Sequence, residues 1–386
     1  MTRLLEMLIS LLIVAVLFVV VGVLLPAERT LVEQVETNRR QTIVFDTINS
    51  FRRFHEWHPM VLYDPRVDLQ RSGPEEGEGA KLTFRSDARA VGDGSWTIIE
   101  SEPRRRVAIA IDDDRRGSNK QTTFTLRPTG RGGRNIEITQ TYSVEYGWNL
   151  IGRYSGLYVS RSVGDSMQLG LSRLSNMLAS VPNVDYAVQG SSLANLRVVE
   201  RPAENLLAVR AGAIERRTAE IQASMESNME WINRTMAAND LEPAGPMRII
   251  STELGRETYN FDVVQPVRTR GSGPDASDNG DGNGDEAGEG NGEEAAAAPV
   301  MVDEGELEDL ELLGPVEYVR TEPTLTAAGD YTGFMAELET VRNAIRAWAM
   351  TQGYEVTGRP YEFYKSGIED SFTADGEYEV YWTIKQ

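Results

Sequence analysis

The sequence contains no cysteine in its 386 residues. This absence excludes disulfide bonds, thiolate nucleophiles, zinc–thiolate sites and the lipidated cysteine of a lipoprotein anchor. It assigns no compartment, because a chain without thiols is indifferent to redox conditions.

Histidine is nearly as scarce as cysteine. The two histidines, His55 and His58, lie in the stretch FHEWHP at 54–59. A metal site would need a third and a fourth ligand at suitable spacing, and HEWH is not the His-Glu-x-x-His of zinc proteases. We therefore favour a structural role for this stretch over pocket lining and over metal binding. We expect neither a metal nor a cofactor.

Basic residues are missing from one long segment. Between Arg270 and Arg320 there is no Lys or Arg but there are 15 Asp or Glu residues, and the formal charge of the whole chain is −20. Outside that segment 44 acidic residues stand against 39 basic ones, so the acidity is local. We expect no nucleic-acid partner, since phosphate requires a basic face.

The middle of this acidic segment, residues 271–299, consists almost entirely of Gly, Asp, Glu, Asn and Ala. Such a composition cannot bury enough apolar surface to offset the entropy lost on ordering, so it predicts a disordered insert. Its Asp-x-Asn-Gly-Asp texture lacks the glutamate spacing of an EF-hand, which argues against a calcium site.

A long apolar run lies near the N-terminus. Residues Met7–Leu25 carry no charge over 19 positions, which spans roughly 28 Å of helix against a hydrocarbon core of ~30 Å. We favour an uncleaved anchor, occupying 1–28 and crossing the membrane through residues 4–25, over a cleaved signal peptide. With Arg3 before the span, the positive-inside rule favours a single-pass bacterial inner-membrane protein whose soluble part is periplasmic.

Residues 29–181 show the pattern of an α+β domain. Residues 30–38 alternate like a strand, 41–57 carry apolar residues at helical spacing, and 81–146 contain short alternating runs typical of an antiparallel meander. An amphipathic helix follows at about 158–179. Together these elements predict a curved sheet that grips a helix, with an apolar cavity between the two.

Four stretches make this domain resemble the START-like (SRPBCC, polyketide cyclase/dehydrase) helix-grip family over about 150 residues. The resemblance implies that Trp57 packs where the first helices meet the sheet and that Pro59 ends the helix. It also implies binding of a hydrophobic ligand, although only some members of the family are catalysts. The stretches are TIVFDTINSFRRFHEWHP, YDPRVDLQRSGPEEGEGAKLTF, GDGSWTIIESEPRRRVAIAI and SVGDSMQLGLSRLSNML.

After a linker at 182–196, residues 197–386 carry the same pattern twice. Each pass reads as strand, helix, strand, strand, with the insert at 271–299 between the two passes. One pass alone cannot cover its own sheet, so we expect the two to pair around a pseudo-twofold axis with a groove between them.

This duplicated layout resembles the gyrase-inhibitor-like domain, which is also the effector-binding domain of some transcription regulators of the AraC type. The family binds small organic molecules, often cationic and aromatic, in an aromatic cleft that contains a carboxylate. Its last strand often reads Glu-Ile-x-x-Pro-Ile. Here residues 379–384 read EVYWTI, so Glu379 takes the acidic place and Thr383 departs from the usual proline. Because no helix-turn-helix precedes the domain, the regulator role does not transfer.

A carboxylate among aromatic rings suits a lipophilic cation, since the ring faces attract the cation and the negative charge offsets its desolvation. The alternative for Glu379 is a solvated surface residue, because alternate residues of any strand point outward. The candidate ligand-binding residues that the resemblance implies are Glu379, Tyr361, Tyr364, Tyr381, Trp382 and, from the first repeat, Asp262.

The function favoured by these features is a membrane-anchored envelope protein that binds small hydrophobic or cationic aromatic molecules. A cyclase or hydrolase is the first alternative, in which Glu362, Tyr364 and Glu379 would supply acid–base groups. A non-catalytic envelope scaffold is the second.

Overall fold

A computed structural model describes residues 2–188, 192–255, 257–272 and 305–385. The chain divides into two compact units, which are described separately below. Unit 1 comprises Met1–Ala187 with Met350–Gly353, and unit 2 comprises Val188–Ala349 with Tyr354–Gln386. Apart from its first two residues, the predicted disordered insert lies outside the described residues.

The N-terminal apolar run forms helix α1 (Thr2–Leu24). Within Arg3–Leu24 a window of 18 residues has a mean hydropathy of 3.2, and nearly all of its side chains are exposed within the chain. By length and composition this helix is able to cross a bilayer, although a signal sequence near an N-terminus would pass the same test.

Unit 1 contains a seven-stranded antiparallel sheet in the order β1-β7-β6-β5-β4-β3-β2. Strands alternate between buried and exposed side chains, as in β7, because one face lies against helices and the other faces outward. All the predicted strands are present, and the structure adds β2, whose sequence DLQRS is mostly exposed and gives no alternating apolar signal. The strands are β1 (Glu28–Thr37), β2 (Asp68–Ser72), β3 (Lys81–Arg85), β4 (Gly94–Glu102), β5 (Arg106–Asp113), β6 (Ser118–Thr129) and β7 (Asn135–Glu145).

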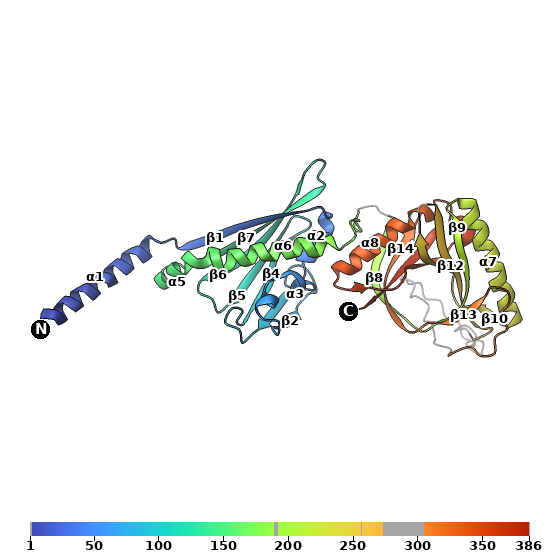
Figure 1. The fold of residues 1–386 in the computed structure, drawn as a ribbon, viewed down its shortest axis with the longest axis horizontal. Coiled ribbons are helices and arrows are strands. Elements are labelled where there is room, and N and C mark those ends of the chain that lie inside the picture. The colour runs from blue at the N-terminus through green and yellow to red at the C-terminus, as the bar shows by residue number, and fades with distance from the viewer. Residues whose placement is uncertain (1, 189–191, 256, 273–304, 386) are drawn as a thin grey trace, which may run out of the picture. The chain divides into compact units, whose positions relative to one another are not determined.

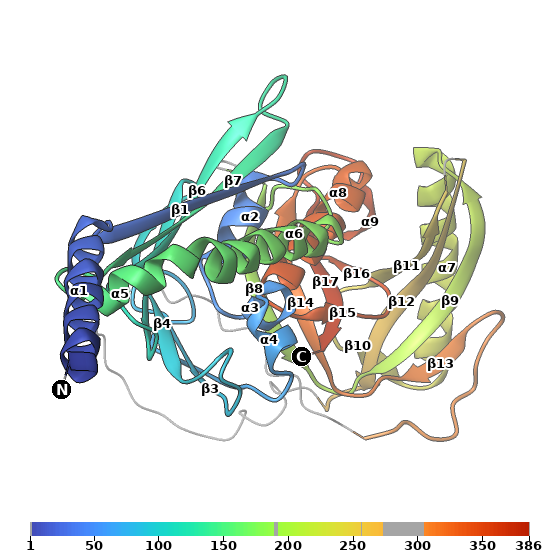
Figure 2. The ribbon, with the colours of Figure 1, turned by 60° about the vertical axis from the view of Figure 1, so that its left-hand side comes forward.

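A helical path from Leu150 to Ala179 lies along one face of this sheet (Figures 1 and 2). It contains α5 (Leu150–Ser155), a 3₁₀ turn η1 (Gly156–Tyr158), a π-helical turn η2 (Ser160–Gly164) and α6 (Asp165–Ala179). The predicted helix at 158–179 is therefore correct in place but irregular in its first turns. Its predicted apolar face packs on the sheet, since Leu171, Leu174 and Leu178 are almost fully buried.

The segment predicted as one helical stretch at 41–57 is two helices, α2 (Gln41–Ile48) and α3 (Phe54–Trp57), followed by α4 (Met60–Tyr63). Arg173 of α6 donates to the backbone carbonyls of Glu56 (2.6 Å) and Trp57 (3.2 Å), which satisfies carbonyls exposed at the end of α3. Pro59 then starts the new turn, because it cannot continue the preceding one. The expected packing of Trp57 against the sheet is present: its ring contacts that of Phe124 on β6 with centroids 6.1 Å apart.

Unit 2 repeats one series of elements, and its strands form one sheet. The order β13-β9-β12-β11-β16-β17-β14-β8 is symmetric about its centre, where β11 pairs with β16. The first strand of each repeat crosses to the outer edge of the other, since β13 pairs with β9 and β8 with β14. The first repeat comprises β8 (Leu193–Arg201), β9 (Asn205–Glu215), α7 (Thr218–Ala238), β10 (Leu241–Pro243), β11 (Arg248–Leu254) and β12 (Thr258–Thr269). The second comprises β13 (Glu317–Arg320), β14 (Thr324–Thr332), α8 (Leu338–Thr351), β15 (Glu355–Val356), β16 (Tyr361–Tyr364) and β17 (Glu377–Lys385).

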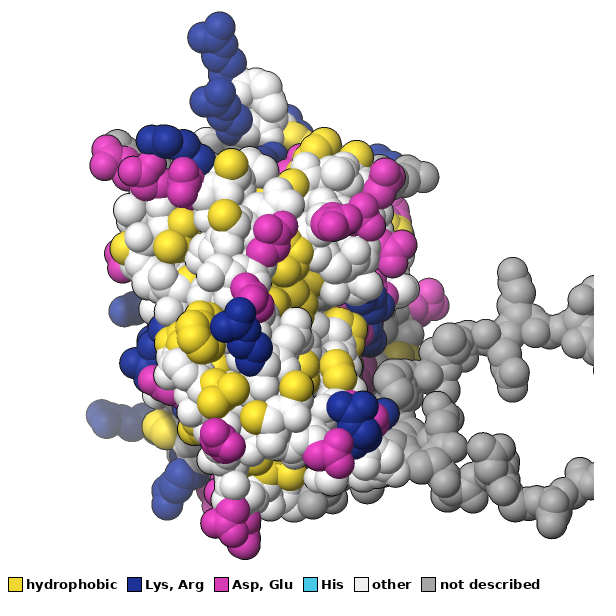
Figure 3. Space-filling view, turned by 90° about the vertical axis from the view of Figure 1, so that its right-hand side faces the viewer, with side chains coloured by type: hydrophobic (Ala, Val, Ile, Leu, Met, Phe, Trp, Pro, Cys, Tyr) yellow, Lys and Arg dark blue, Asp and Glu magenta, His cyan; other side chains and the backbone are white. Residues whose placement is uncertain are grey.

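Helices α7 and α8 supply apolar side chains to the main core of unit 2, where Met225 and Ile345 meet Ile249, Val263 and Val380 of the sheet. Two short helical turns, η4 (Met335–Glu337) and α9 (Gly367–Asp370), complete the second repeat. Figure 3 shows one face of the molecule, on which acidic and basic side chains are interspersed with apolar ones. The protein is therefore α+β, with an apolar N-terminal helix, a helix-grip-like sheet and a second sheet domain.

Candidate ligand-binding site

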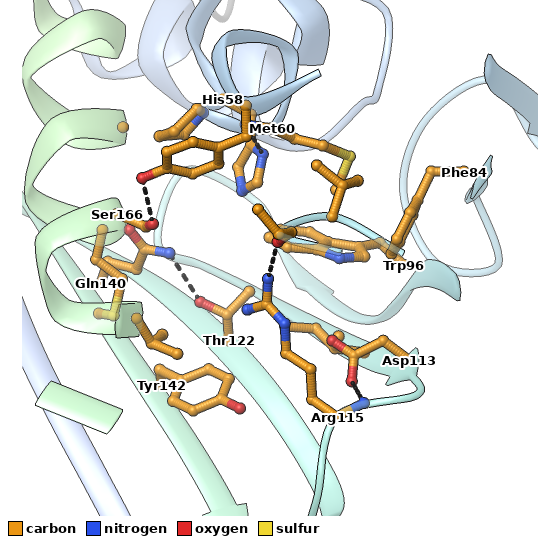
Figure 4. A pocket seen from close by; sticks show the side chains of 18 of the residues that line it. His58, Met60, Phe84, Trp96, Asp113, Arg115, Thr122, Gln140, Tyr142 and Ser166 are labelled. Carbon is orange, nitrogen blue, oxygen red and sulfur yellow. Dashed lines mark hydrogen bonds between the residues drawn. The ribbon is translucent and has the colours of Figure 1, made fainter. Parts of the chain in front are cut away.

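Unit 1 holds a cavity of about 80 Å³ between its sheet, the short helices α3 and α4, and α6. Figure 4 shows its two sides: His58, between α3 and α4, and Met60, at the start of α4, lie on one side, while Thr122, Gln140 and Tyr142 rise from the strands. The apolar side chains in its wall are Trp57, Pro59, Met60, Phe84, Val91, Trp96, Ile111, Val163 and Met167.

The last three residues of the FHEWHP stretch, Trp57, His58 and Pro59, line one wall of this cavity. His58 stacks on Phe54 with ring centroids 4.3 Å apart, and Trp96 meets the His58 ring edge-on at 4.8 Å. The backbone N–H of Met60 donates to His58 Nδ1 (3.3 Å), so the neutral ring carries its proton on Nε2. His55 is exposed and does not line the cavity. His58 therefore has two roles: it packs in the fold, which is the favoured role, and it lines the pocket, which is the alternative.

The surroundings of His58 keep its ring neutral. Burial, and next the positive charge of Arg115, lower the pKa of His58 to about 3. Burial, and next the Asp113 carboxylate, raise the pKa of Tyr142 well above its ordinary value, so that its hydroxyl keeps its proton. At neutral pH these two rings therefore contribute polar but uncharged groups to the cavity.

The other polar groups of the wall have partners of their own. Gln140 donates to the Thr122 hydroxyl (3.0 Å), and both side chains are almost fully buried. Lys120, only 6% exposed, donates to the Asp113 carboxylate (2.5 Å) and neutralises it. At the rim, Arg115 donates to the carbonyl of Ala90 (2.7 Å).

The helical side of the cavity is joined to α4 by one side-chain hydrogen bond, between the hydroxyls of Tyr63 and Ser166 (2.9 Å; Figure 4). Val163 reaches the wall from the π-helical turn η2, which displaces side chains relative to a regular α-helix. Gly170 supplies the close approach of α6, because a Cβ there would lie 3.2 Å from Pro59 Cδ.

The chemistry that this arrangement supports is the binding of an uncharged apolar molecule. The Trp57 indole N–H is buried and has no acceptor among the described residues. The cavity also lacks a nearby pair of unpartnered acid–base groups in the described part of the chain, since Asp113 is held by Lys120. A histidine with a pKa of about 3 is a weak base, so the geometry favours binding over proton transfer.

The residues predicted from the second resemblance lie on both faces of the unit 2 sheet. Tyr361, Tyr381 and Glu379 share the face opposite α7 and α8, with the two tyrosine rings stacked at 5.2 Å. Asp262 faces the same way, because β12 alternates and its Phe261 and Val263 enter the helix-side core. Burial raises the pKa of Asp262 above its ordinary range.

Tyr364 and Trp382 lie on the helix-covered face instead. Tyr364 belongs to the main core, and the Arg346 guanidinium of α8 lies 5.6 Å from the centroid of the Trp382 ring. Glu362, the candidate for acid–base chemistry, is fully buried. Arg342 donates to both of its carboxylate oxygens, one from Nε and the other from Nη2. Period-two alternation separates Tyr361 from Tyr364 and Tyr381 from Trp382.

We call the face opposite α7 and α8 the open face. Two arginines of the chain lie over its cluster of aromatic rings. Arg201 lies over Phe363 (5.1 Å) and Tyr381 (5.2 Å), and Arg248 lies over Phe363 (4.7 Å) and Tyr361 (5.1 Å). Both guanidinium groups pair with buried Glu204. Nearby, Glu379 is paired with Arg197 and lies 3.9 Å from the Lys365 ammonium.

Comparison with known proteins supports one part of the chain. Residues 28–178 match the model of the family described as polyketide cyclase / dehydrase and lipid transport. A search of curated proteins returned no significant match.

Three solved structures illustrate what resembles the chain in fold. Truncated norcoclaurine synthase from Thalictrum flavum is 10% identical, with 40% of this chain and 94% of that chain covered and a TM-score of 0.32. A Thermobifida fusca protein solved by NMR is 18% identical over 39% and 93% of the two chains, with a TM-score of 0.31. The EcmrR C-terminal domain is 12% identical over 50% and 98%, with a TM-score of 0.34.

Proposed function

We propose that this chain is a membrane-anchored bacterial envelope protein that binds a small hydrophobic molecule in the unit 1 cavity. The observation that carries the proposal is the cavity itself, whose wall is predominantly apolar and whose carboxylate, Asp113, is neutralised by Lys120. The family matched at residues 28–178 includes lipid transport in its description, which agrees with an apolar ligand. Helix α1 would hold the protein in the inner membrane, with the remainder in the periplasm.

The polar groups of the wall favour a neutral ligand with one hydrogen-bond acceptor. His58 is uncharged at neutral pH and Asp113 is neutralised by Lys120, so a cationic ligand inside the cavity would lack a counter-charge; the charge left among the lining residues is the Arg115 guanidinium at the rim. The buried Trp57 N–H, without an acceptor among the described residues, would gain one from such a ligand. A volume of about 80 Å³ is small for a ligand site, so a larger molecule would have to widen the cavity; the Tyr63–Ser166 hydrogen bond between α4 and α6 is one contact that could yield.

The test is to fill the cavity with a larger side chain at Val163, in the π-helical turn η2 that precedes α6. In Val163→Phe the added ring occupies the cavity, whereas in the matched control Leu169→Phe it points to solvent from an exposed site on the same helical path. With the full chain and an anilinonaphthalene dye as the probe, we expect about tenfold weaker binding for Val163→Phe and unchanged binding for the control. Equal binding by both variants would contradict the proposal.

The enzyme and scaffold alternatives give different results in the same preparation. A native mass spectrum of the full chain that shows a co-purifying apolar molecule favours binding. New product masses after incubation with cell extract favour an enzyme. A scaffold is favoured if the Val163→Phe variant binds the dye as tightly as the wild type does and the mass spectrum shows no co-purifying molecule.

We extend the proposal to the open face of unit 2, as a site for an aromatic cation. The stacked Tyr361–Tyr381 pair and the Glu379 carboxylate on the same face support it. Such a ligand must displace Arg201 from the Tyr381 ring. With tetraphenylphosphonium as the probe, Arg201→Ser should strengthen binding and Glu379→Gln should weaken it; no binding by either variant would contradict this site.

A further inference from the structure

The segment Trp148–Tyr158 presents an unusual concentration of exposed apolar side chains at one end of unit 1. The exposed fractions are 82% for Trp148, 55% for Ile151, 50% for Leu157 and 71% for Tyr158. Isolated exposed apolar residues are common on soluble proteins, but four within eleven positions form a patch. Three of these residues belong to the first turns of the helical path, and none of the four lines the unit 1 cavity.

The same segment is bound to the last turns of α1. Arg153 donates to the carbonyls of Gly22 (3.3 Å), Val23 (2.8 Å) and Leu25 (3.1 Å), which have no partners further along the helix. Tyr154 donates to the carbonyl of Phe18 (2.7 Å). α5 is therefore fixed beside α1 through directed contacts at its C-terminal end, as both ribbon views show (Figures 1 and 2).

The side chains of α1 and α5 also pack directly against each other. The Tyr154 ring stacks on Phe18 with centroids 4.4 Å apart. Gly22 lies against Leu150, where an added Cβ would be only 3.2 Å from the Leu150 Cβ. These contacts reach six residues back from the end of α1, which is about 9 Å along the helix axis. If α1 crosses a bilayer, this part of α5 lies at the boundary of the bilayer that is nearer to the C-terminal end of α1.

Charge in this region also suits a lipid surface. Residues 147–164 contain no acidic residue, in a chain of net charge −20, and of their two arginines Arg153 is buried against α1. Arg161 is exposed, and the Arg153 guanidinium lies 5.5 Å from the centroid of the Trp148 ring. Tryptophan and tyrosine are the side chains enriched where hydrocarbon meets headgroups, and arginine attracts anionic headgroups.

We propose that Trp148–Tyr158 is a second membrane-contact element, which rests unit 1 on the outer surface of the bilayer that α1 crosses. Its partner is the headgroup and upper acyl region of that bilayer. The inference rests on the membrane anchoring in the proposed function. It adds a place for the cavity, because Val163 in its wall follows Tyr158 by five helical residues, about 8 Å.

The absence of cysteine allows a clean test, because each introduced thiol is the sole labelling site. The variants Ile151→Cys and Leu157→Cys report on the patch, and Leu17→Cys reports on α1. Ile99→Cys, at a residue 44% exposed on β4, is the matched control for an apolar surface residue elsewhere on unit 1. Each full-length variant carries a polarity-sensitive fluorophore in vesicles of phosphatidylcholine and phosphatidylglycerol.

We expect the labels at 151 and 157 to show blue-shifted emission, quenching by a nitroxide on the lipid acyl chain, and protection from iodide. The label at 99 should show the reverse. If the label at 17 is quenched by lipid while those at 151 and 157 behave like that at 99, the second contact is overturned and the anchor stands. If the label at 17 also remains in water, both the anchor and the contact are overturned.

Discussion

His58 makes the stability of unit 1 depend on pH. Its ring lies against Phe54 and Trp96, and burial lowers its pKa to about 3, against an ordinary value near 6.5. The unfolded chain therefore binds a proton between these two values that the folded chain excludes. The contribution to stability is fully present above pH 6.5 and is lost as pH falls toward 3.

We expect His58→Asn to reduce the slope of the free energy of unfolding against pH between about 6.5 and 3. The slope owed to one proton is at most about 1.4 kcal/mol per pH unit. Asparagine retains an oxygen that can accept from the Met60 N–H but does not titrate. Urea unfolding of the two proteins across this range measures the difference.

His55→Asn is the matched control, because His55 is exposed one helical turn earlier. Asp46 acts in the opposite direction: burial raises its pKa to about 6, so its contribution is present at low pH and is lost as pH rises through 6. Comparing each variant with the wild type cancels that background. If both histidine variants keep the wild-type slope, the exclusion of a proton from His58 is wrong.

Single residues were predictable where a pattern constrained them. The apolar face of the last helix of unit 1 followed from helical spacing, and Leu171, Leu174 and Leu178 are buried as expected. The cavity residues Gln140 and Asp113 carried no such signal, because only the folded sheet brings β7 and β5 to one wall. In β16 and β17, strict alternation would have placed Tyr364 and Trp382 away from Tyr361 and Tyr381.

At the scale of elements, the contact of α8 with β16 depends on a buried ion pair. Arg342 of α8 binds Glu362 of β16 through both carboxylate oxygens, and Glu362 is fully buried. Removal of one partner leaves an uncompensated charge inside the helix–sheet layer, which costs much more than the loss of an exposed pair.

We expect Arg342→Leu to lower the free energy of unfolding of unit 2 by about 3 to 5 kcal/mol. The double variant Arg342→Leu/Glu362→Leu should recover much of this loss, since it removes both charges. Lys385→Ala, which breaks an exposed pair with Glu355, should change stability by less than about 1 kcal/mol. Denaturant unfolding measures all three; equal effects of Arg342→Leu and Lys385→Ala would contradict the buried pair.

Element order was largely predictable, because most strands and the long helices of both units carry their own period, whereas the exposed strand β2 does not. The irregular stretch from α5 to η2 was not, since a π-helical turn depends on contacts with other elements. The predicted single stretch at 41–57 divides for a similar reason: Arg173, more than a hundred positions later, satisfies the end of α3.

At the scale of the whole molecule, the strand order of unit 2 joins parts of the chain on either side of the insert. Strands β13 and β14 follow residues 271–299, yet they pair with β9 and β8, which precede them. A cut within the insert therefore leaves two pieces that share one sheet.

We expect a full-length chain with a site-specific protease sequence placed after Gly282 to remain a single species after cleavage. The two fragments should elute together in size-exclusion chromatography and separate only in denaturant, because three strand pairings hold them together. Fragments that separate in native buffer would contradict the interleaved order.

The crossed first strands also determine when the sheet of unit 2 can form during synthesis of the chain. β8 emerges early from the ribosome, but the strand that pairs with it is synthesised much later: the Thr326 hydroxyl of β14 donates to the carbonyl of Val199, 127 positions away. Until then, the nascent chain carries an unpaired strand edge, which is prone to associate with other chains. If the protein is exported as proposed, that interval continues through translocation, because β14 can pair with β8 only after it too has left the translocon.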